Sequence, residues 1–351
     1  MRALYVEGKL LSEHHEALQR KSGFEVGLAL ALHGPHADTI LRLIPTPEPE
    51  DDTTTLDVDW VSEHATQVAS MLPGGLVVVG FYLLASSSNL SSLEPKIVSV
   101  LAALAKQLPS TAEKQAVVLQ LPTDSRKPIC RTLAAPGAKL QTLELKLTSS
   151  AAQFHCFCTA WQVDVELGFD KGEDGPSVVS ASKLLSVVKS VKTSMSSAIA
   201  TVDGALPAPG APVNSLPAAG TIARPHTVDF FSPEATLHAF AGEMELIASG
   251  RLRGTVRGRA FAGAKEEVTW AVRMLMNDLI ASLRIRLSLL VDDISDEGES
   301  GGIALDTADA WALPQRAHVD IGGGISLCDH ISEGENISDS ADRLCELTGV
   351  Q

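Results

Sequence analysis

The chain has 351 residues, 45% of them apolar and 20% charged, so it can bury a substantial core and is not a disordered segment. Its 43 acidic side chains outnumber its 28 basic ones and give a formal net charge of −15, which argues against non-specific binding to nucleic acid. The five cysteines are odd in number and sparse for 351 residues, which indicates a reducing cytosol rather than a disulfide framework. No stretch predicts a signal peptide or a transmembrane helix.

The first 55 residues predict a strand, a helix and a hairpin, followed by a loop. The strand opens the chain, the helix covers residues 10–20, and the hairpin pairs residues 24–32 with residues 39–43. Residues 45–55 are first proline-rich and then acidic, which predicts a loop.

Residues 56–85 are the most regular stretch, and the other elements are interpreted around it. Apolar residues at three- and four-residue steps predict a helix with one buried face: Val58, Val61, Ala65, Val68 and Leu72. Asp57 is the expected N-cap, and Pro73-Gly74-Gly75 ends the helix, because proline lacks an amide hydrogen and glycine accepts positive φ. The apolar run over residues 76–84, interrupted only by Gly80, predicts a strand covered on both faces, at the centre of a layered α/β domain.

This stretch resembles the core of MPN domains, the fold of the JAMM metalloproteases. In that family a buried strand ends in Gly-aromatic-aromatic, as Gly80-Phe81-Tyr82 does here, and runs into a His-x-His pair that binds zinc. The two histidine positions hold Leu83 and Ala85, and no aspartate occurs between Asp59 and Asp124. Leucine and alanine have no donor atom for zinc, so the resemblance implies an MPN-like fold without metal, cofactor or hydrolytic activity.

Within that fold, residues 63–81 are most similar to the odorant response abnormal protein 4 family, and residues 252–290 and 313–329 resemble the same family. The resemblance implies a non-enzymatic scaffold that binds and positions a cysteine protease specific for the ubiquitin-fold modifier. It also implies a place at the cytosolic face of the endoplasmic reticulum and a role in membrane-receptor folding or trafficking. Family members usually carry a C-terminal anchor that is not evident here, so either this form is truncated or anchoring has been lost.

The remaining sequence predicts an α/β fold whose mixed central sheet is flanked by helices and followed by a smaller α+β part. We predict an MPN-like domain over residues 1–170, a helix and an Ala/Pro/Gly-rich mobile linker or insertion over 171–225, and the α+β part over 226–351. The last part would contain a hairpin over 241–261 that turns at Ser249-Gly250, a long helix over 264–290, a second hairpin over 317–329, and a terminal helix. Whether 226–351 is a separate domain stays open.

Two surfaces are candidates for partner binding. Trp60, His64, Gln67 and Met71 recur at helical spacing, displaced from the buried stripe of their helix. This second stripe either meets another MPN-like domain, as the corresponding helix commonly does in that fold, or forms a second packing layer within the chain.

The second candidate surface is a strand with arginines at alternate positions: Arg251, Arg253, Arg257 and Arg259. Alternate residues share one face of a strand, so these like charges repel unless they are matched. The strand is either a solvated face paired with the chain's own acids or a docking face for an acidic partner.

Three further patterns favour a structural interpretation. His155 with Cys156 and Cys158 has no second cysteine pair for a metal site, Ser86–Ser88 have no evident base, and Gly322–Gly324 precede no Gly-Lys-Ser/Thr. The alternative functions are a hydrolase with a relocated site and a non-catalytic subunit of another MPN-containing assembly.

Overall fold

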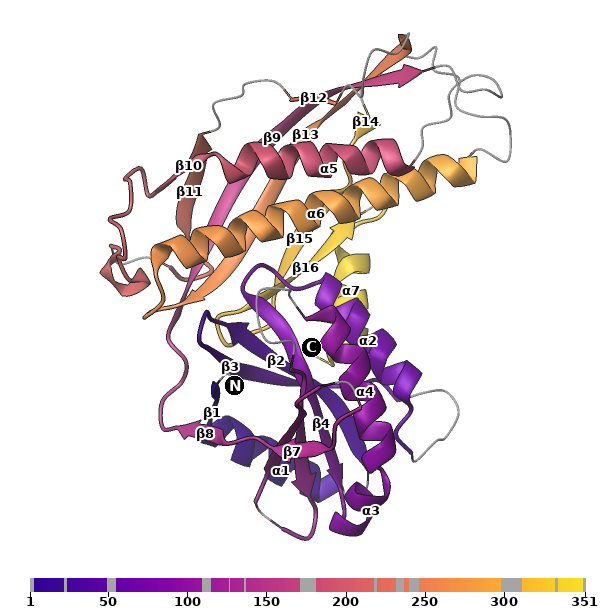
Figure 1. Ribbon diagram of the computed structural model, residues 1–351, viewed down its shortest axis with the longest axis vertical. Helices are drawn as coiled ribbons and strands as arrows, with labels where there is room; N and C mark the ends of the chain where they lie inside the picture. Colours follow the sequence, from indigo (N-terminus) through magenta and orange to yellow (C-terminus); the bar gives the residue numbers. More distant parts are fainter. Residues whose placement is uncertain are drawn as a thin grey trace.

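The computed structural model describes residues 3–21, 24–48, 55–108, 115–125, 127–135, 137–170, 181–217, 220–231, 237–239, 246–297, 311–331 and 334–349. Figure 1 shows a lower body built on one sheet and an upper body in which two long helices, α5 (Ala181–Ser196) and α6 (Val268–Glu297), lie across a second sheet. The predicted α/β fold class, a mixed sheet flanked by helices and followed by an α+β part, is confirmed.

The first sheet has eight strands in the order β7-β6-β5-β4-β2-β3-β1-β8. Their bounds are β1 Ala3–Glu7, β2 Glu25–His33, β3 Ala37–Pro45, β4 Leu76–Ala85, β5 Val117–Pro122, β6 Ile129–Leu133, β7 Leu140–Thr142 and β8 Leu145–Thr148. Strands β7 and β8 stand at opposite ends of this order, yet only Leu143 and Glu144 separate them in the chain. The sheet must therefore curl until its two ends approach each other.

Strand β4 lies at the centre of this sheet and is buried over its whole length, as predicted. It pairs antiparallel with β2 and parallel with β5. The register with β2 shifts beside Gly80, because Ala29 faces Gly80 whereas Leu30 faces Val78. Such a bulge changes which residues face each side of a sheet. As a result Phe81, Leu83 and Ala85 all face the core beneath the helices.

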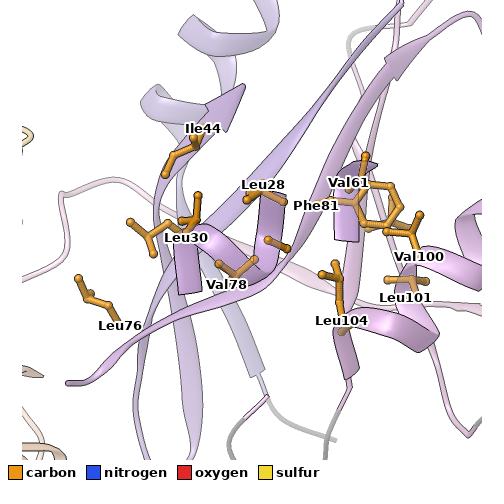
Figure 2. Close-up of a cluster of buried hydrophobic side chains, with 14 of the residues drawn as sticks. Leu28, Leu30, Ile44, Val61, Leu76, Val78, Phe81, Val100, Leu101 and Leu104 are labelled. Carbon is orange, nitrogen blue, oxygen red and sulfur yellow. The ribbon is translucent and has the colours of Figure 1, made fainter. Parts of the chain in front are cut away.

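That core lies between the sheet and two helices, α2 (Val58–Ser70) and α4 (Glu94–Gln107), which follows the short α3 (Ser87–Ser92). Figure 2 shows Phe81 of β4 beside Val61 of α2 and Val100 of α4. The side chain of Asp57 caps α2, as predicted, by accepting hydrogen bonds from the amides of Asp59 and Trp60. The other face of the sheet forms a second core with α1 (Gly8–Lys21).

The second sheet contains β9 Phe154–Asp170, β10 Ile199–Val202, β11 His226–Phe231, β12 Leu237–Ala239, β13 Leu246–Gly263 and β14 Trp311–Ala312. The predicted hairpin over 241–261 is wrong, because β13 runs as one strand through Ser249 and Gly250, antiparallel to β9; residues 241–245 lie outside the described part. The long partner strand β9 overrides the local turn signal of Ser-Gly. Helices α5 and α6 cover one face of this sheet.

Residues 203–217, predicted as part of a linker, pack against the chain through a 3-10 turn at Val213–Ser215. Val213 is fully buried, its amide donates to the carbonyl of Glu266, and the amide of Val268 donates to the carbonyl of Ala211. The change from the first sheet to the second falls between β8 and β9. The domain boundaries at 170 and 225 remain predictions.

The C-terminal elements return to the first core. The hairpin of β15 (Gln315–Asp320) and β16 (Ser326–Ile331) and the helix α7 (Ile337–Thr348) bury Leu327 and Leu344 in the same core as α2 and β4. The turn after α2 in addition extends the second sheet, because Gly74 exchanges two backbone hydrogen bonds with Arg259 and Phe261 of β13. The two sheets are therefore joined both by the C-terminal hairpin and by this turn.

Candidate functional site

The strand end that would carry the zinc ligands of an MPN enzyme is part of the core. Leu83 is fully buried and Ala85 is 1% exposed, and both pack beneath α2 and α4. Neither side chain has a nitrogen, oxygen or sulfur atom to offer a metal. Among the described residues, no group of three or more histidine, cysteine, aspartate or glutamate side chains is placed to hold a metal ion.

The serines after this strand begin α3. The hydroxyl of Ser86 accepts a hydrogen bond from the amide of Asn89, and the hydroxyl of Ser87 donates to Asp124 over 2.6 Å. This hydrogen bond lowers the pKa of Asp124. The described contacts of Ser87 include no histidine, so the pair lacks the base that would activate a nucleophile.

His155 and Cys158 lie on opposite faces of β9, because side chains alternate along a strand. Cys156 is buried in the first core. His155 Nδ1 instead lies 3.0 Å from His226 Nε2, and His226 Nδ1 lies 2.7 Å from a carboxylate oxygen of Asp203. Sequence reasoning missed this hydrogen-bonded chain, because its members are 23 and 71 residues apart.

The candidate stripe on α2 divides into a buried and an exposed half. His64 is 4% exposed, and its ring nitrogens lie 3.1 Å from the Thr46 hydroxyl and 2.7 Å from the Leu347 carbonyl. Met71 is also buried. Trp60 is 41% exposed and donates from its indole to the carbonyl of Pro47, and Gln67 is exposed beside Glu63. Of these four residues, only Trp60 and Gln67 are exposed and thus accessible to a partner.

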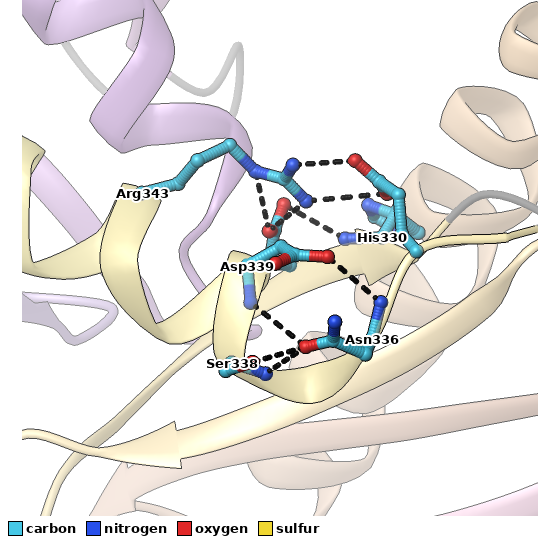
Figure 3. A network of polar contacts seen from close by, with 7 residues as sticks. His330, Asn336, Ser338, Asp339 and Arg343 are labelled. Carbon is cyan, nitrogen blue, oxygen red and sulfur yellow. Dashed lines mark hydrogen bonds and ion pairs between the residues drawn. The ribbon is translucent and has the colours of Figure 1, made fainter.

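Helix α7 packs on His64, Cys328 of β16 contacts Met71, and polar contacts hold α7 in place (Figure 3). Arg343 donates to Asp329 of β16 and to Glu335 in the loop before the helix. Asn336 and Asp339 form a capping box at the start of the helix. The sequence did not indicate that α7 would pack on α2, since 283 residues separate His64 from Leu347.

The arginines of β13 differ in their surroundings. The register places Arg251 opposite Glu166 and Arg253 opposite Asp164, and the side chains of these four residues lie outside the described part. Arg257 is exposed. Arg259 is half-buried and donates to the Ser326 hydroxyl, so its side chain links β13 to β16.

A buried charged cluster joins β13, α6 and the C-terminal hairpin. The carboxylate of Asp278 accepts two hydrogen bonds from Arg316, at 2.6 and 2.9 Å, and one each from the amides of Gly74 and Arg259. The side chains of Asp278 and Arg316 are 1% and 3% exposed. Arg286 donates to the Thr255 carbonyl on the edge of β13. These contacts occupy a strand edge that would otherwise be free.

The sequence contains a local pattern that points to this cluster. Asp278, Ser282 and Arg286 recur every four residues along the long helix, which places them on one face. The cluster also affects the pKa values of two neighbouring histidines. Burial, together with the positive charge of Arg316, lowers the pKa of His318 to about 3 and that of His330 to about 4.

Comparisons with known proteins agree on one family. The family model described as "Odorant response abnormal 4-like" matches residues 33–351. The protein odr-4 homolog of Xenopus laevis is 23% identical over an alignment 381 residues long, gaps included, which covers 99% of this chain and 83% of the relative. The mouse protein odr-4 homolog is 21% identical over 322 residues, covering 86% of this chain and 70% of the relative.

Among solved structures, the chain is similar to one described as the crystal structure of UfSP from C. elegans. The TM-score is 0.41 and the identity 12%; the alignment covers 100% of this chain, which spans 57% of the length of the other.

No helix in the described part of the chain combines the length and the apolar character needed to cross a membrane.

Proposed function

The chain belongs to the odorant response abnormal 4-like family, and from this premise we propose that it is a non-catalytic scaffold with an MPN-like domain. Its partner would be a cysteine protease specific for the ubiquitin-fold modifier, which it positions at the cytosolic face of the endoplasmic reticulum. Through that protease it would act in the folding or trafficking of membrane receptors. The partner and the location follow from the family resemblance of the sequence.

One observation carries the non-catalytic part of the proposal. The strand that would end in the metal-binding histidines of an MPN enzyme ends in Leu83 and Ala85, whose side chains are packed in the core. A donor placed at either position by mutation would face Val61 and the α4 side chains rather than a water-filled site. The end of this strand therefore contributes to the stability of the core.

The exposed half of the α2 stripe is the proposed contact with the protease. Trp60 is held in place by its hydrogen bond to Pro47 and still exposes 41% of its surface. A fixed, exposed tryptophan contributes large contact area at little entropic cost. Gln67 lies on the same exposed side of the helix, and Arg257 offers a second contact for an acidic partner.

The test is a binding measurement between the purified protein and the purified protease. Trp60→Ala should weaken binding by about 2 kcal/mol or more, roughly 30-fold, because interface tryptophans are usually central contacts. The melting temperature should fall much less than for a fully buried tryptophan, whose truncation costs about 3–5 kcal/mol, because Trp60 is 41% exposed. Ile129→Ala, at a residue that is 38% exposed on β6, is the matched control and should bind normally. Unchanged binding by Trp60→Ala would contradict this surface.

Two alternatives are separated by further measurements. A subunit of another MPN-containing assembly would fail to bind the protease, and a pull-down of the full chain from cells would recover that assembly instead. A hydrolase with a relocated site would be, for instance, a serine enzyme or an atypical metal enzyme, and the metal enzyme would hold stoichiometric zinc after purification without chelator. We expect no stoichiometric metal, and elemental analysis decides the point.

A further inference from the structure

A pocket of about 430 Å³ lies where β1, β3, the link between the two sheets and the C-terminal hairpin meet. It is separate from the α2 surface and from the buried cluster around Asp278. Its lining combines charged groups with apolar walls, among them Glu7, Leu41, Arg42, Ala152, Phe154 and Ile325. The volume falls within the roughly 300–1,000 Å³ of small-molecule sites.

A bulge in β3 brings Arg42 to this pocket. Residue Leu30 of β2 faces Arg42 and the next residue, Ala31, faces Ile40, so Leu41 is an extra residue in β3. Bulges of this kind redirect side chains and end strand pairing. On its other side β3 pairs with β1 only as far as Ile40. The bulge thus lies where β1 ends and the pocket opens.

Arg42 is a half-buried cation with few protein partners. Its Nη1 donates to the carbonyl of Ile321 in the turn of the C-terminal hairpin, which holds the guanidinium at the pocket. Burial lowers the pKa of Arg42. A guanidinium has five N–H donors, and no carboxylate among the described residues forms an ion pair with this one. Partial burial of a cation without an anion is unfavourable, and a bound anionic group would offset that cost.

Glu7 supplies the opposite charge to the same pocket. It is the last residue of β1, is half-buried, and forms no hydrogen bond or ion pair through its carboxylate within the described part of the chain. No ion pair joins it to Arg42, although both line one cavity. Two opposite charges that face one cavity without pairing are arranged for a ligand that carries both charges.

The walls between these charges are apolar. Leu41 and Phe154 pack at the margin of the first core, and Ile325 is 2% exposed. Such walls favour an apolar side chain on the ligand. The turn residues Gly322 and Gly323 have φ of +81° and +69°, and the absence of side chains there leaves the pocket open.

We propose that this pocket binds a small zwitterion of the class of an amino acid or dipeptide with an apolar side chain, its carboxylate at Arg42 and its ammonium at Glu7. The ligand would bridge β1 and β3 of the first sheet to the C-terminal hairpin. The site does not depend on the scaffold function proposed above. It would let a small molecule stabilise the contact between the hairpin turn and β3.

The experiment titrates the full chain, labelled with 15N, with three probes that differ only in their end charges: Leu-Leu, N-acetyl-Leu-Leu and Leu-Leu amide. The zwitterion Leu-Leu should bind most tightly and shift the amide signals of Gly322, Gly323 and Ala152. Each blocked probe loses one ionic contact and should bind about tenfold more weakly. Equal binding of the three probes would contradict the assignment of charges.

Two variants assign each charge to its end of the ligand. Arg42→Gln should weaken the binding of Leu-Leu and N-acetyl-Leu-Leu about tenfold and leave the binding of Leu-Leu amide unchanged. Glu7→Gln should weaken the binding of Leu-Leu and Leu-Leu amide about tenfold and leave the binding of N-acetyl-Leu-Leu unchanged. The matched controls are Arg131→Gln and Glu13→Gln, which remove charges from exposed or half-exposed ion pairs with Glu94 and Lys9. They should bind all three probes as the wild type does.

Failure of the pocket is distinguishable from failure of a variant to fold. If Arg42→Gln lowers the melting temperature strongly, Arg42→Lys retains the charge and Glu7→Gln still tests the ammonium end. The proposal is overturned if the wild type shows no saturable binding of Leu-Leu up to about 10 mM, or if both variants bind Leu-Leu like the wild type.

Discussion

His318 and His330 are held neutral by their surroundings. Both are close to the guanidinium groups of Arg286 and Arg316, and His318 Nδ1 is buried without a protein hydrogen-bond partner among the described residues. Burial disfavours a positive charge on either imidazole, and the neighbouring guanidinium groups repel it as well, so the pKa values fall from 6.5 to about 3 and about 4. The carboxylate of Asp278 acts on the guanidinium groups of Arg286 and Arg316, and the carboxylate that opposes the pKa shift of His330 is Asp329.

These shifts predict that the protein loses stability in mild acid. Below pH 6.5 the unfolded chain binds protons at both histidines and the folded chain does not, so the free energy of unfolding falls as the pH drops from about 6.5 toward 4. Each histidine contributes a slope of up to about 1.4 kcal/mol per pH unit in this range. Urea unfolding of wild type and His318→Gln across pH 4–7 measures the difference. Parallel stability curves for the two proteins would show that His318 titrates normally in the folded state.

At the scale of elements, the bulge beside Gly80 decides what β4 presents to each core. Before it, Val77 and Val79 face the core under α1; after it, Tyr82 and Leu84 do so, and Leu83 faces α2 and α4. A strand without the bulge would place these residues on the opposite faces. The glycine is required because a Cβ at position 80 would lie 1.8 Å from the carbonyl oxygen of Val117.

We therefore predict that Gly80→Ala is strongly destabilising although it adds one methyl group. Strand β5 would have to move away from β4, at a cost of at least about 1–3 kcal/mol. Gly8→Ala is the control, since a Cβ there would lie 3.7 Å from its nearest neighbour. Thermal unfolding of the two variants gives the comparison. A Gly80→Ala protein that melts with the wild type would refute the tight pairing of β4 with β5.

At the scale of the molecule, the C-terminal hairpin and α7 complete a core that begins near the N-terminus. Leu344 of α7 and Leu327 of β16 are 2% and 0% exposed in the cluster that contains Val61 and Phe81. The amide of Cys328 bonds to the carbonyl of Met71 at the end of α2. These contacts couple α2 and β4 to the C-terminal hairpin and α7, so we expect these elements to unfold together.

Leu344→Ala tests this coupling. Removing the buried side chain should cost about 2–5 kcal/mol, and the loss should be visible as faster amide hydrogen exchange in α2 as well as in α7. Leu206→Ala, at a position that is 69% exposed, is the control and should leave exchange in both helices unchanged. Faster exchange confined to α7 would mean that this helix unfolds independently of the core.

Local patterns in the sequence were sufficient for α2, its cap at Asp57, the turn at Gly74-Gly75 and the buried strand β4, because the residues that cause these features are neighbours in the chain. The absence of donor atoms at Leu83 and Ala85 is also a property of the sequence alone, and it holds in any fold. A local pattern that occurs in more than one kind of secondary structure predicted less. Ser249-Gly250 predicted a turn, whereas pairing with β9 made the same residues part of one long strand.

The tertiary structure alone decided which polar and apolar side chains are available. His64 and Met71 have the spacing of a surface stripe, yet α7 and β16 bury them, and only Trp60 and Gln67 remain exposed. The cluster at Asp278 and the pocket between Glu7 and Arg42 likewise join segments far apart in the chain. Periodicity along one element shows which side chains share a face, but it contains no information about which distant element covers that face.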